Sequence, residues 1–153
     1  MVSTLSSPLP HPALPNADWG DAYEVTTSGG FASARQAAQA VVDAFPLWTY
    51  PLLVLRNVIV WPFGLKNTRH AATMLPEPVG FFPVQAETTH QVVAGFDDKH
   101  LDFRLIVDLD STDAQQQIRV TTVVHRNNRL GRWYLAMVLP FHRAIIKSAL
   151  GRL

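Results

Sequence analysis

The sequence predicts an α+β domain, on two observations. Four segments of alternating apolar and polar residues follow one another between positions 80 and 126, a pattern typical of antiparallel strands joined by short turns. A long stretch, Leu130–Leu153, then carries bulky apolar side chains at three- and four-residue steps, which predicts an amphipathic helix. Such a helix needs a broad apolar surface to cover. We therefore expect a curved antiparallel sheet with a long C-terminal helix packed on it.

The first third of the domain predicts a strand and two helices. Ala22–Thr27 has the composition of a strand and is followed by two glycines. Ala32–Phe45 is dense in alanine and glutamine, and Ser33 is placed to cap its N-terminus. Pro51 can open a second helix at its first turn, and Gly64 can close it.

Residues 1–16 predict a disordered lead-in, because they are rich in proline and serine and show no apolar periodicity. We expect them to be dispensable for folding, with a single domain over residues 17–153. The N-terminus lacks the basic and apolar regions of a signal peptide, so we expect a cytoplasmic protein. The apolar run at 47–61 is shorter than the roughly twenty residues of a membrane span, which favours a buried helix.

Composition and charge narrow the classes of function. The sequence has no cysteine, which excludes disulfides, thiolate catalysis and cysteine-bound metals. The six histidines form no motif with metal-ligand spacing, so we expect no metal and no cofactor. All 12 acidic residues lie at or before Asp113, and only basic charges follow. We interpret these cations as partners of acids on neighbouring strands rather than as a nucleic-acid surface.

The register of the last two strands follows from their alternation. Facing their apolar sides together pairs Phe103 with Val124, Leu105 with Thr122, and Val107 with Val120. The same register sets Asp108 against Arg119 and Asp102 near His125 on the opposite face. The preceding strand, Gln91–Phe96, adds Val92, Ala94 and Phe96 to the apolar side.

This order of elements is similar to the helix-grip arrangement of the START-like (SRPBCC) superfamily. Seven blocks of the chain also resemble those of a bacterial family of domains of unknown function, family 2867: Ala17-Asp18-Trp19, Leu55-Arg56-Asn57, Phe63-Gly64-Leu65-Lys66, Gly80-Phe81-Phe82-Pro83-Val84, Asp97-Asp98-Lys99-His100-Leu101-Asp102-Phe103-Arg104, Gly131-Arg132-Trp133-Tyr134-Leu135 and Pro140-Phe141-His142-Arg143. The resemblance implies the fold and an apolar cavity under the last helix, but no catalytic residues. Members of the family also occur attached to reductase-type Rossmann domains.

The sequence offers four candidate catalytic residues. Asp102 could orient His125 as a general base while Arg104 polarises a substrate oxygen. Ordinary cross-strand pairing on the solvated face of the sheet explains the same three residues and is the interpretation that we favour. His142 follows Pro140, which frees a backbone carbonyl, so it serves either as a structural histidine or as a polar group in a cavity.

Three functions stay open at this stage. The first is a module that binds a small apolar or aromatic molecule between the sheet and the last helix. Its expected ligand-binding residues are Phe103, Leu105, Thr122, Val124, Tyr134, Met137 and Phe141. The second is a cyclase, dehydratase or isomerase that uses acid–base residues in that cavity. The third is an interaction module that forms a homodimer or serves a reductase partner.

Overall fold

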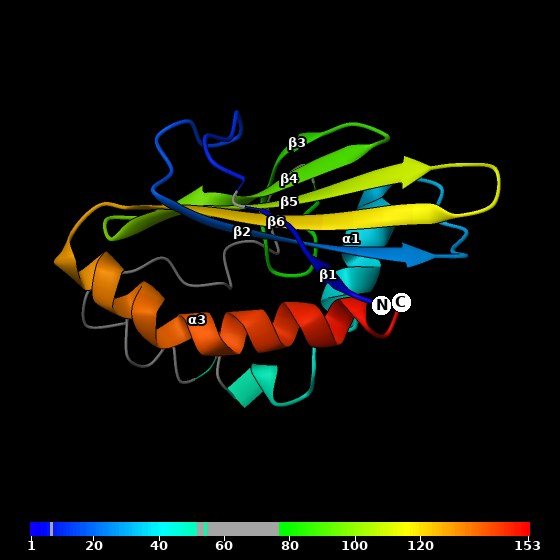
Figure 1. The fold of residues 1–153 in the computed structure, drawn as a ribbon. Coiled ribbons are helices and arrows are strands. Elements are labelled where there is room, and N and C mark those ends of the chain that lie inside the picture. The colour runs from blue at the N-terminus through cyan, green and yellow to red at the C-terminus, as the bar shows by residue number, and fades with distance from the viewer. Residues whose placement is uncertain (7, 52–53, 55–76) are drawn as a thin grey trace.

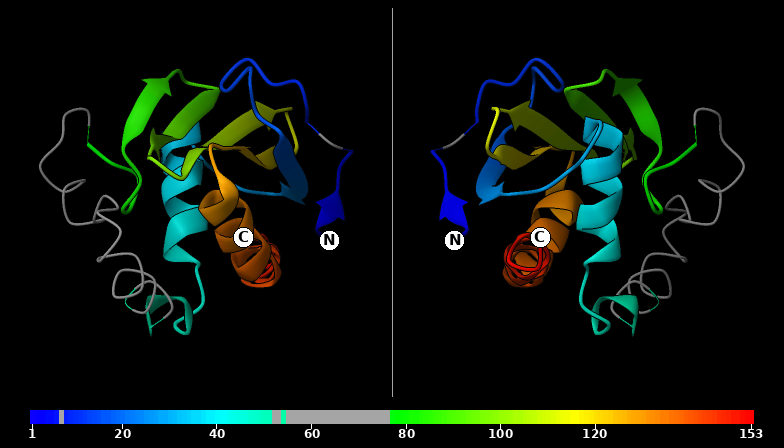
Figure 2. Two further views of the ribbon diagram at one scale, coloured as in Figure 1. Left: turned by 90° about the vertical axis from the view of Figure 1, so that its left-hand side faces the viewer. Right: turned by 90° about the vertical axis from the view of Figure 1, so that its right-hand side faces the viewer.

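The computed structural model describes residues 1–6, 8–51, 54 and 77–153 and has the expected α+β architecture (Figure 1). An antiparallel sheet has the strand order β1-β2-β6-β5-β4-β3. The strands are β1 Ser3–Thr4, β2 Trp19–Thr27, β3 Val84–Glu87, β4 Gln91–Asp97, β5 Leu101–Ser111 and β6 Gln116–Arg126. Helices α1 Ala34–Asp43 and α3 Arg129–Leu150 lie on the same side of this curved sheet (Figures 1 and 2).

The predicted register of the meander is confirmed. β5 and β6 pair Phe103 with Val124 and Leu105 with Thr122, and Asp102 lies opposite His125. β4 adds Val92, Ala94 and Phe96 to the same face. One face of the sheet therefore carries the apolar residues that both helices cover, because strict alternation fixes which face each residue takes.

Two strands have other limits than the sequence predicts. β2 begins at Trp19 and pairs with β6 along its whole length, so it is longer than Ala22–Thr27. The strand expected from residue 80 begins only at Val84. The chain before it makes a tight turn at Gly80, whose φ is +60°, and the backbones of Val79 and Phe82 hydrogen-bond to each other in both directions.

Helix α1 forms as predicted, and Ser33 caps it. The Ser33 side chain accepts a hydrogen bond from the backbone N–H of Gln36 at 3.3 Å. Ala37, Ala38 and Val41 are buried against the sheet. Residues 49–51 and 54 are also helical. The rest of the second helix predicted between Pro51 and Gly64 lies outside the described residues.

Helix α3 spans the stretch predicted for it, but its orientation about its own axis differs from the prediction. Asn128 caps it by accepting from the N–H of Gly131 at 3.0 Å, and the helix continues through Pro140. Its buried side chains include Leu135 and Ile146, at 7% and 2% exposure.

The prediction that Met137 and Phe141 face the sheet is wrong. These side chains are 38% and 45% exposed, and with Trp133 they form a stripe on the outer side of α3. Both sides of this helix are apolar, so the pattern alone defines two alternative contact faces. The face that packs carries Leu135 and Ile146, and the large side chains of Trp133, Met137 and Phe141 lie on the other side.

Residues 8–16 lie over the outer face of the sheet, opposite α3, whereas β1 extends the edge of the sheet (Figure 1). β1 pairs with β2, and Leu14 is only 6% exposed. Leu14 packs in a cluster with Val93, Ile106 and Val123. The sequence suggests no such contact, because the apolar residues of this segment show no period. Whether the segment is needed for folding stays a prediction.

Candidate functional site

An apolar cavity of about 170 Å³ lies between the sheet, α3 and the chain that follows α1. Phenylalanine rings form much of its wall, and they contact one another in a continuous row: Phe45, Phe81, Phe82, Phe103 and Phe96. The closest pair, Phe81 and Phe82, has ring centroids 4.3 Å apart. Such a wall suits a flat apolar molecule, since aromatic rings stack or meet edge to face at these separations.

Helix α3 supplies the opposite wall. Val138, Ile145 and Ile146 are its apolar contributions, and Tyr134 and His142 are its polar ones. The helical spacing of these residues brings them to the same side. The segment after α1 adds Thr49, which is 4% exposed. Ligand pockets typically combine an apolar lining with a few polar groups of this kind.

The hydroxyl of Thr49 is an unusual feature of this wall. Within the described part of the chain, its Oγ1 is buried and has no hydrogen-bond partner. A buried hydroxyl left unpaired costs about 1–3 kcal/mol. A ligand with a hydrogen-bonding group would remove that cost.

Behind His142 lies a carboxylate on the inner face of the sheet. Asp21 is in register with Thr122, which in turn pairs with Leu105, so its side chain takes the face that α3 covers. His142 Nε2 lies 3.3 Å from Asp21 Oδ1, and the Tyr23 hydroxyl donates to Asp21 Oδ2 at 3.2 Å. The side chains of His142 and Asp21 are only 17% and 12% exposed.

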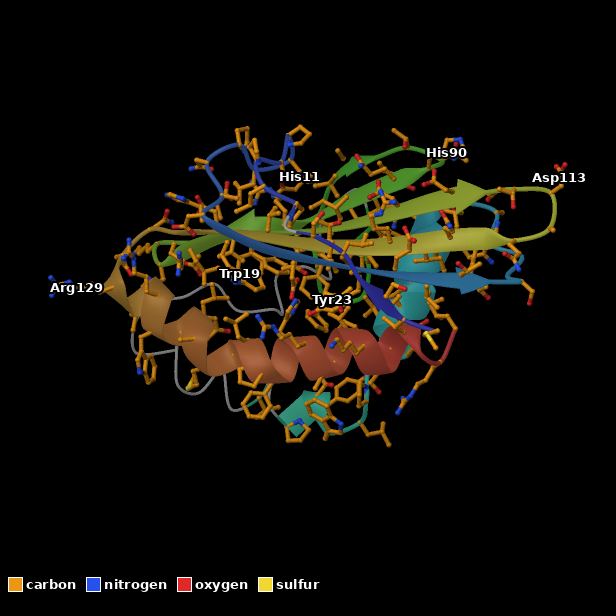
Figure 3. All side chains as sticks on the ribbon, viewed as in Figure 1. His11, Trp19, Tyr23, His90, Asp113 and Arg129 are labelled. Atoms are coloured by element: carbon orange, nitrogen blue, oxygen red, sulfur yellow. The ribbon has the colours of Figure 1, made fainter. Side chains whose placement is uncertain are left out.

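The surroundings of this group are aromatic. Trp19 meets the His142 ring edge on, with centroids 6.1 Å apart, and Trp19 and Tyr23 both lie between the sheet and α3 (Figure 3). Burial raises the pKa of Tyr23 above its ordinary value, and the neighbouring Asp21 charge and hydrogen bond raise it further. Tyr23 therefore keeps its proton at neutral pH and acts as a fixed donor to Asp21.

Asp21 and Thr49 were not among the residues that the sequence singled out. A signal for Asp21 was present, since the alternation of β2 continues back through Tyr23 and Asp21 to Trp19. Because the predicted strand began at Ala22, Asp21 fell outside it and was not assigned to the inner face of the sheet. Thr49 gives no comparable signal, because a threonine near the start of a helix is ordinary.

Three of the seven expected ligand-binding residues line the cavity. Phe103 and Leu105 contribute from β5, and Tyr134 from α3. Thr122 and Val124 are buried on the same face of the sheet, each 2% exposed, but do not line the cavity. Met137 and Phe141, which are exposed on α3, are not among the residues that line it.

The candidate catalytic residues on the strands lie on the other face of the sheet. Asp102 and His125 are neighbours in register, but Asp102 accepts from Asn127 Nδ2 at 3.1 Å and His125 Nδ1 lies 4.0 Å from Asp18. Arg104 is buried and bonds Asp97 at 2.7 Å. Of the four candidates, only His142 lies at the cavity.

The described residues contain no group of three or more histidine or acidic side chains that could hold a metal ion. No helix in the described ranges is long and apolar enough to cross a membrane.

Comparison with known proteins identifies the chain only by family. The model of the family described as "Protein of unknown function (DUF2867)" matches residues 13–149. The chain belongs to the DUF2867 family. No curated protein matches, and no solved structure does either. The DUF2867 match spans both sides of the cavity, from β2 through most of α3, so all the residues that form the site fall within the family domain.

Proposed function

We propose that this DUF2867 domain is a START-like helix-grip module of bacterial origin that binds a small apolar or aromatic molecule between the sheet and α3. The observation that carries the proposal is the cavity of about 170 Å³ walled by five phenylalanines. The cavity opens to solvent and combines a mostly apolar lining with a few polar groups, as small-molecule sites typically do. A bound ligand would cover this apolar surface.

The test is native mass spectrometry of freshly purified protein, followed by extraction and identification of any bound molecule. Val138→Phe, on the cavity wall, fills the space and should abolish the bound mass. Ala144→Phe is the matched control, because Ala144 lies on the exposed side of the same helix. The thermal midpoints of both variants show that each is folded.

Retention of the ligand by Val138→Phe would place it elsewhere and contradict the proposal. If the wild-type protein carries no mass, added ethylbenzene serves as the probe in calorimetric titration. A folded protein that binds neither an extracted molecule nor this probe would contradict the proposal as well.

One observation favours a second candidate function, a proton-transfer enzyme of the isomerase or dehydratase kind. An imidazole paired with a carboxylate at the wall of an apolar cavity is an arrangement suited to a general base. Such an enzyme would exchange a proton of its bound ligand with solvent. Deuterium incorporation into the extracted ligand in heavy water, absent with His142→Gln, is the corresponding measurement.

A further inference from the structure

The polarity of the Asp21–His142 pair limits which ligand the cavity can hold. An ionised carboxylate only accepts hydrogen bonds, so the contact between Asp21 Oδ1 and His142 Nε2 requires the proton to be on Nε2. A ring that carries its one proton on Nε2 presents Nδ1 as an acceptor. Tyr23 occupies the other oxygen of Asp21, which holds the carboxylate in place for this contact.

The acceptor nitrogen is left for a ligand. Among the described residues no hydrogen bond to His142 Nδ1 is found, and this nitrogen is not among the fully buried atoms without a partner. His142 lines the cavity and its side chain is 17% exposed, so a small molecule in the cavity can approach the ring. The partner of Nδ1 must be a hydrogen-bond donor, because a lone pair cannot bind another acceptor.

The remaining contacts decide the kind of donor. A carboxylate ligand has no proton to donate at neutral pH, and its charge would lie close to that of Asp21. An ammonium group would lose most of its hydration in this cavity, and both oxygens of the nearby Asp21 carboxylate already contact His142 and Tyr23. A hydroxyl is a neutral donor and avoids both penalties. A second polar group on the same molecule could pair with the unsatisfied Oγ1 of Thr49.

We propose that the ligand is a small aromatic molecule with a hydroxyl group, a phenol in the simplest case, whose O–H donates to His142 Nδ1. This inference rests on the proposed function, since it names the class of molecule that the same cavity takes. In it, Asp21 is a positioning residue that fixes the tautomer of His142, and Tyr23 fixes Asp21.

The test compares two probes of nearly the same shape, 4-ethylphenol and ethylbenzene, by isothermal titration calorimetry. One neutral hydrogen bond is expected to make 4-ethylphenol bind the wild-type protein roughly five- to tenfold more tightly. In His142→Phe the two probes should bind equally, because the ring remains and the acceptor is lost. His90→Phe is the matched control, since His90 is exposed at the β3–β4 turn on the far side of the sheet and should leave the preference intact (Figure 3).

His142→Phe leaves Asp21 without its imidazole, which could prevent folding. The double variant Asp21→Asn/His142→Phe removes the unpaired charge and keeps the measurement possible. Equal binding of both probes to the wild-type protein would overturn the hydroxyl inference and leave the proposed function standing. A preference that persists in the folded variants would overturn it too. Binding of neither probe would overturn the hydroxyl inference, and it would overturn the proposed function as well if no molecule can be extracted from the protein.

Discussion

Individual side chains on α3 show how differently two apolar residues of one helix behave. Ile146 is 2% exposed and belongs to the main core, whereas Phe141 is 45% exposed on the outer stripe. We expect Ile146→Ala to lower the free energy of unfolding by about 2–5 kcal/mol, because it removes buried methyl groups and leaves a cavity. Phe141→Ala should change it by less than about 1 kcal/mol. Urea titrations of both variants measure the difference.

A loss of several kcal/mol for Phe141→Ala would mean that the outer stripe of α3 is covered in solution. An oligomer contact would make that loss depend on protein concentration. Repeating the titration at two concentrations therefore separates such a contact from packing within one chain.

The residue scale is also where the sequence predicts least. The register of β5 and β6 could be derived, because a slip of one residue would expose Leu105 and Val107 and bury polar neighbours. The face of α3 could not, because Trp133 and Met137 compete with Leu135 for the sheet and nothing local decides between them. The polar end of the cavity depends on Asp21 and His142, which are separated by most of the chain and meet only in the folded domain.

The first element-scale prediction concerns the start of α3, where the helix approaches the turn before β5. A Cβ placed on Gly131 would lie 2.1 Å from the carbonyl oxygen of His100. Gly131→Ala should therefore destabilise the domain by about 1–3 kcal/mol, even though alanine ordinarily favours a helix over glycine by about 1 kcal/mol. Chemical denaturation measures this change.

Gly151 is the matched control for that substitution. It ends the same helix with a right-handed φ of −69°, and the nearest atom to an added Cβ is 3.2 Å away. Gly151→Ala should be within about 0.5 kcal/mol of the wild type. Equal effects at both positions would show that the approach of α3 to His100 is looser than the structure has it.

The second element-scale prediction concerns an ion pair that joins α1 to β3. Arg35 Nε donates to Glu87 Oε1 at 2.8 Å, and this hydrogen bond lowers the pKa of Glu87 below its ordinary value and raises that of Arg35. Both side chains are about a third exposed, so the pair contributes only about 0.2–1 kcal/mol. We expect Glu87→Gln to lose about this much stability at pH 7.

The sign of the pH dependence follows from the lowered pKa of Glu87. A carboxylate whose pKa is lower in the folded state stabilises the fold fully above its unfolded-state pKa. That stabilisation is lost as the pH falls through the folded-state value. The difference in urea midpoint between wild type and Glu87→Gln should therefore be present at pH 7 and shrink as the pH falls below the ordinary glutamate pKa of about 4.3. If the difference in urea midpoint stays constant over this pH range, the lost stability comes from packing and not from the charge of Glu87.

The whole molecule has two faces with different roles. The inner face, α3 and the chain after α1 line the cavity, while the outer face is partly covered by the N-terminal segment (Figures 1 and 2). Ion pairs join β6 to the chain of β2 and the residue before it: Arg119 pairs with Glu24, and Arg126 pairs with Asp18. Part of the basic C-terminal third is thus neutralised by acids of the sheet. Arg119 lies opposite Asp108 as predicted, but its ion pair is with Glu24, and Asp108 accepts a hydrogen bond from Gln91 Nε2 at 2.7 Å.

Deleting residues 1–16 tests how much of the domain depends on its outer face. The deletion removes the pairing of β1 with β2 and the burial of Leu14. The burial of the Leu14 side chain alone contributes about 1.5–3 kcal/mol. In a domain of this size each kcal/mol shifts the thermal midpoint by about 2–4 °C, so a fall of roughly 3–12 °C is expected. Thermal unfolding followed by circular dichroism measures it.

Deleting only residues 1–6 keeps Leu14 and should lower the thermal midpoint less. Leu14→Ala in the full chain should reproduce most of the larger fall. An unchanged midpoint for the longer deletion would show that Leu14 adds no stable contact to the cluster of Val93, Ile106 and Val123.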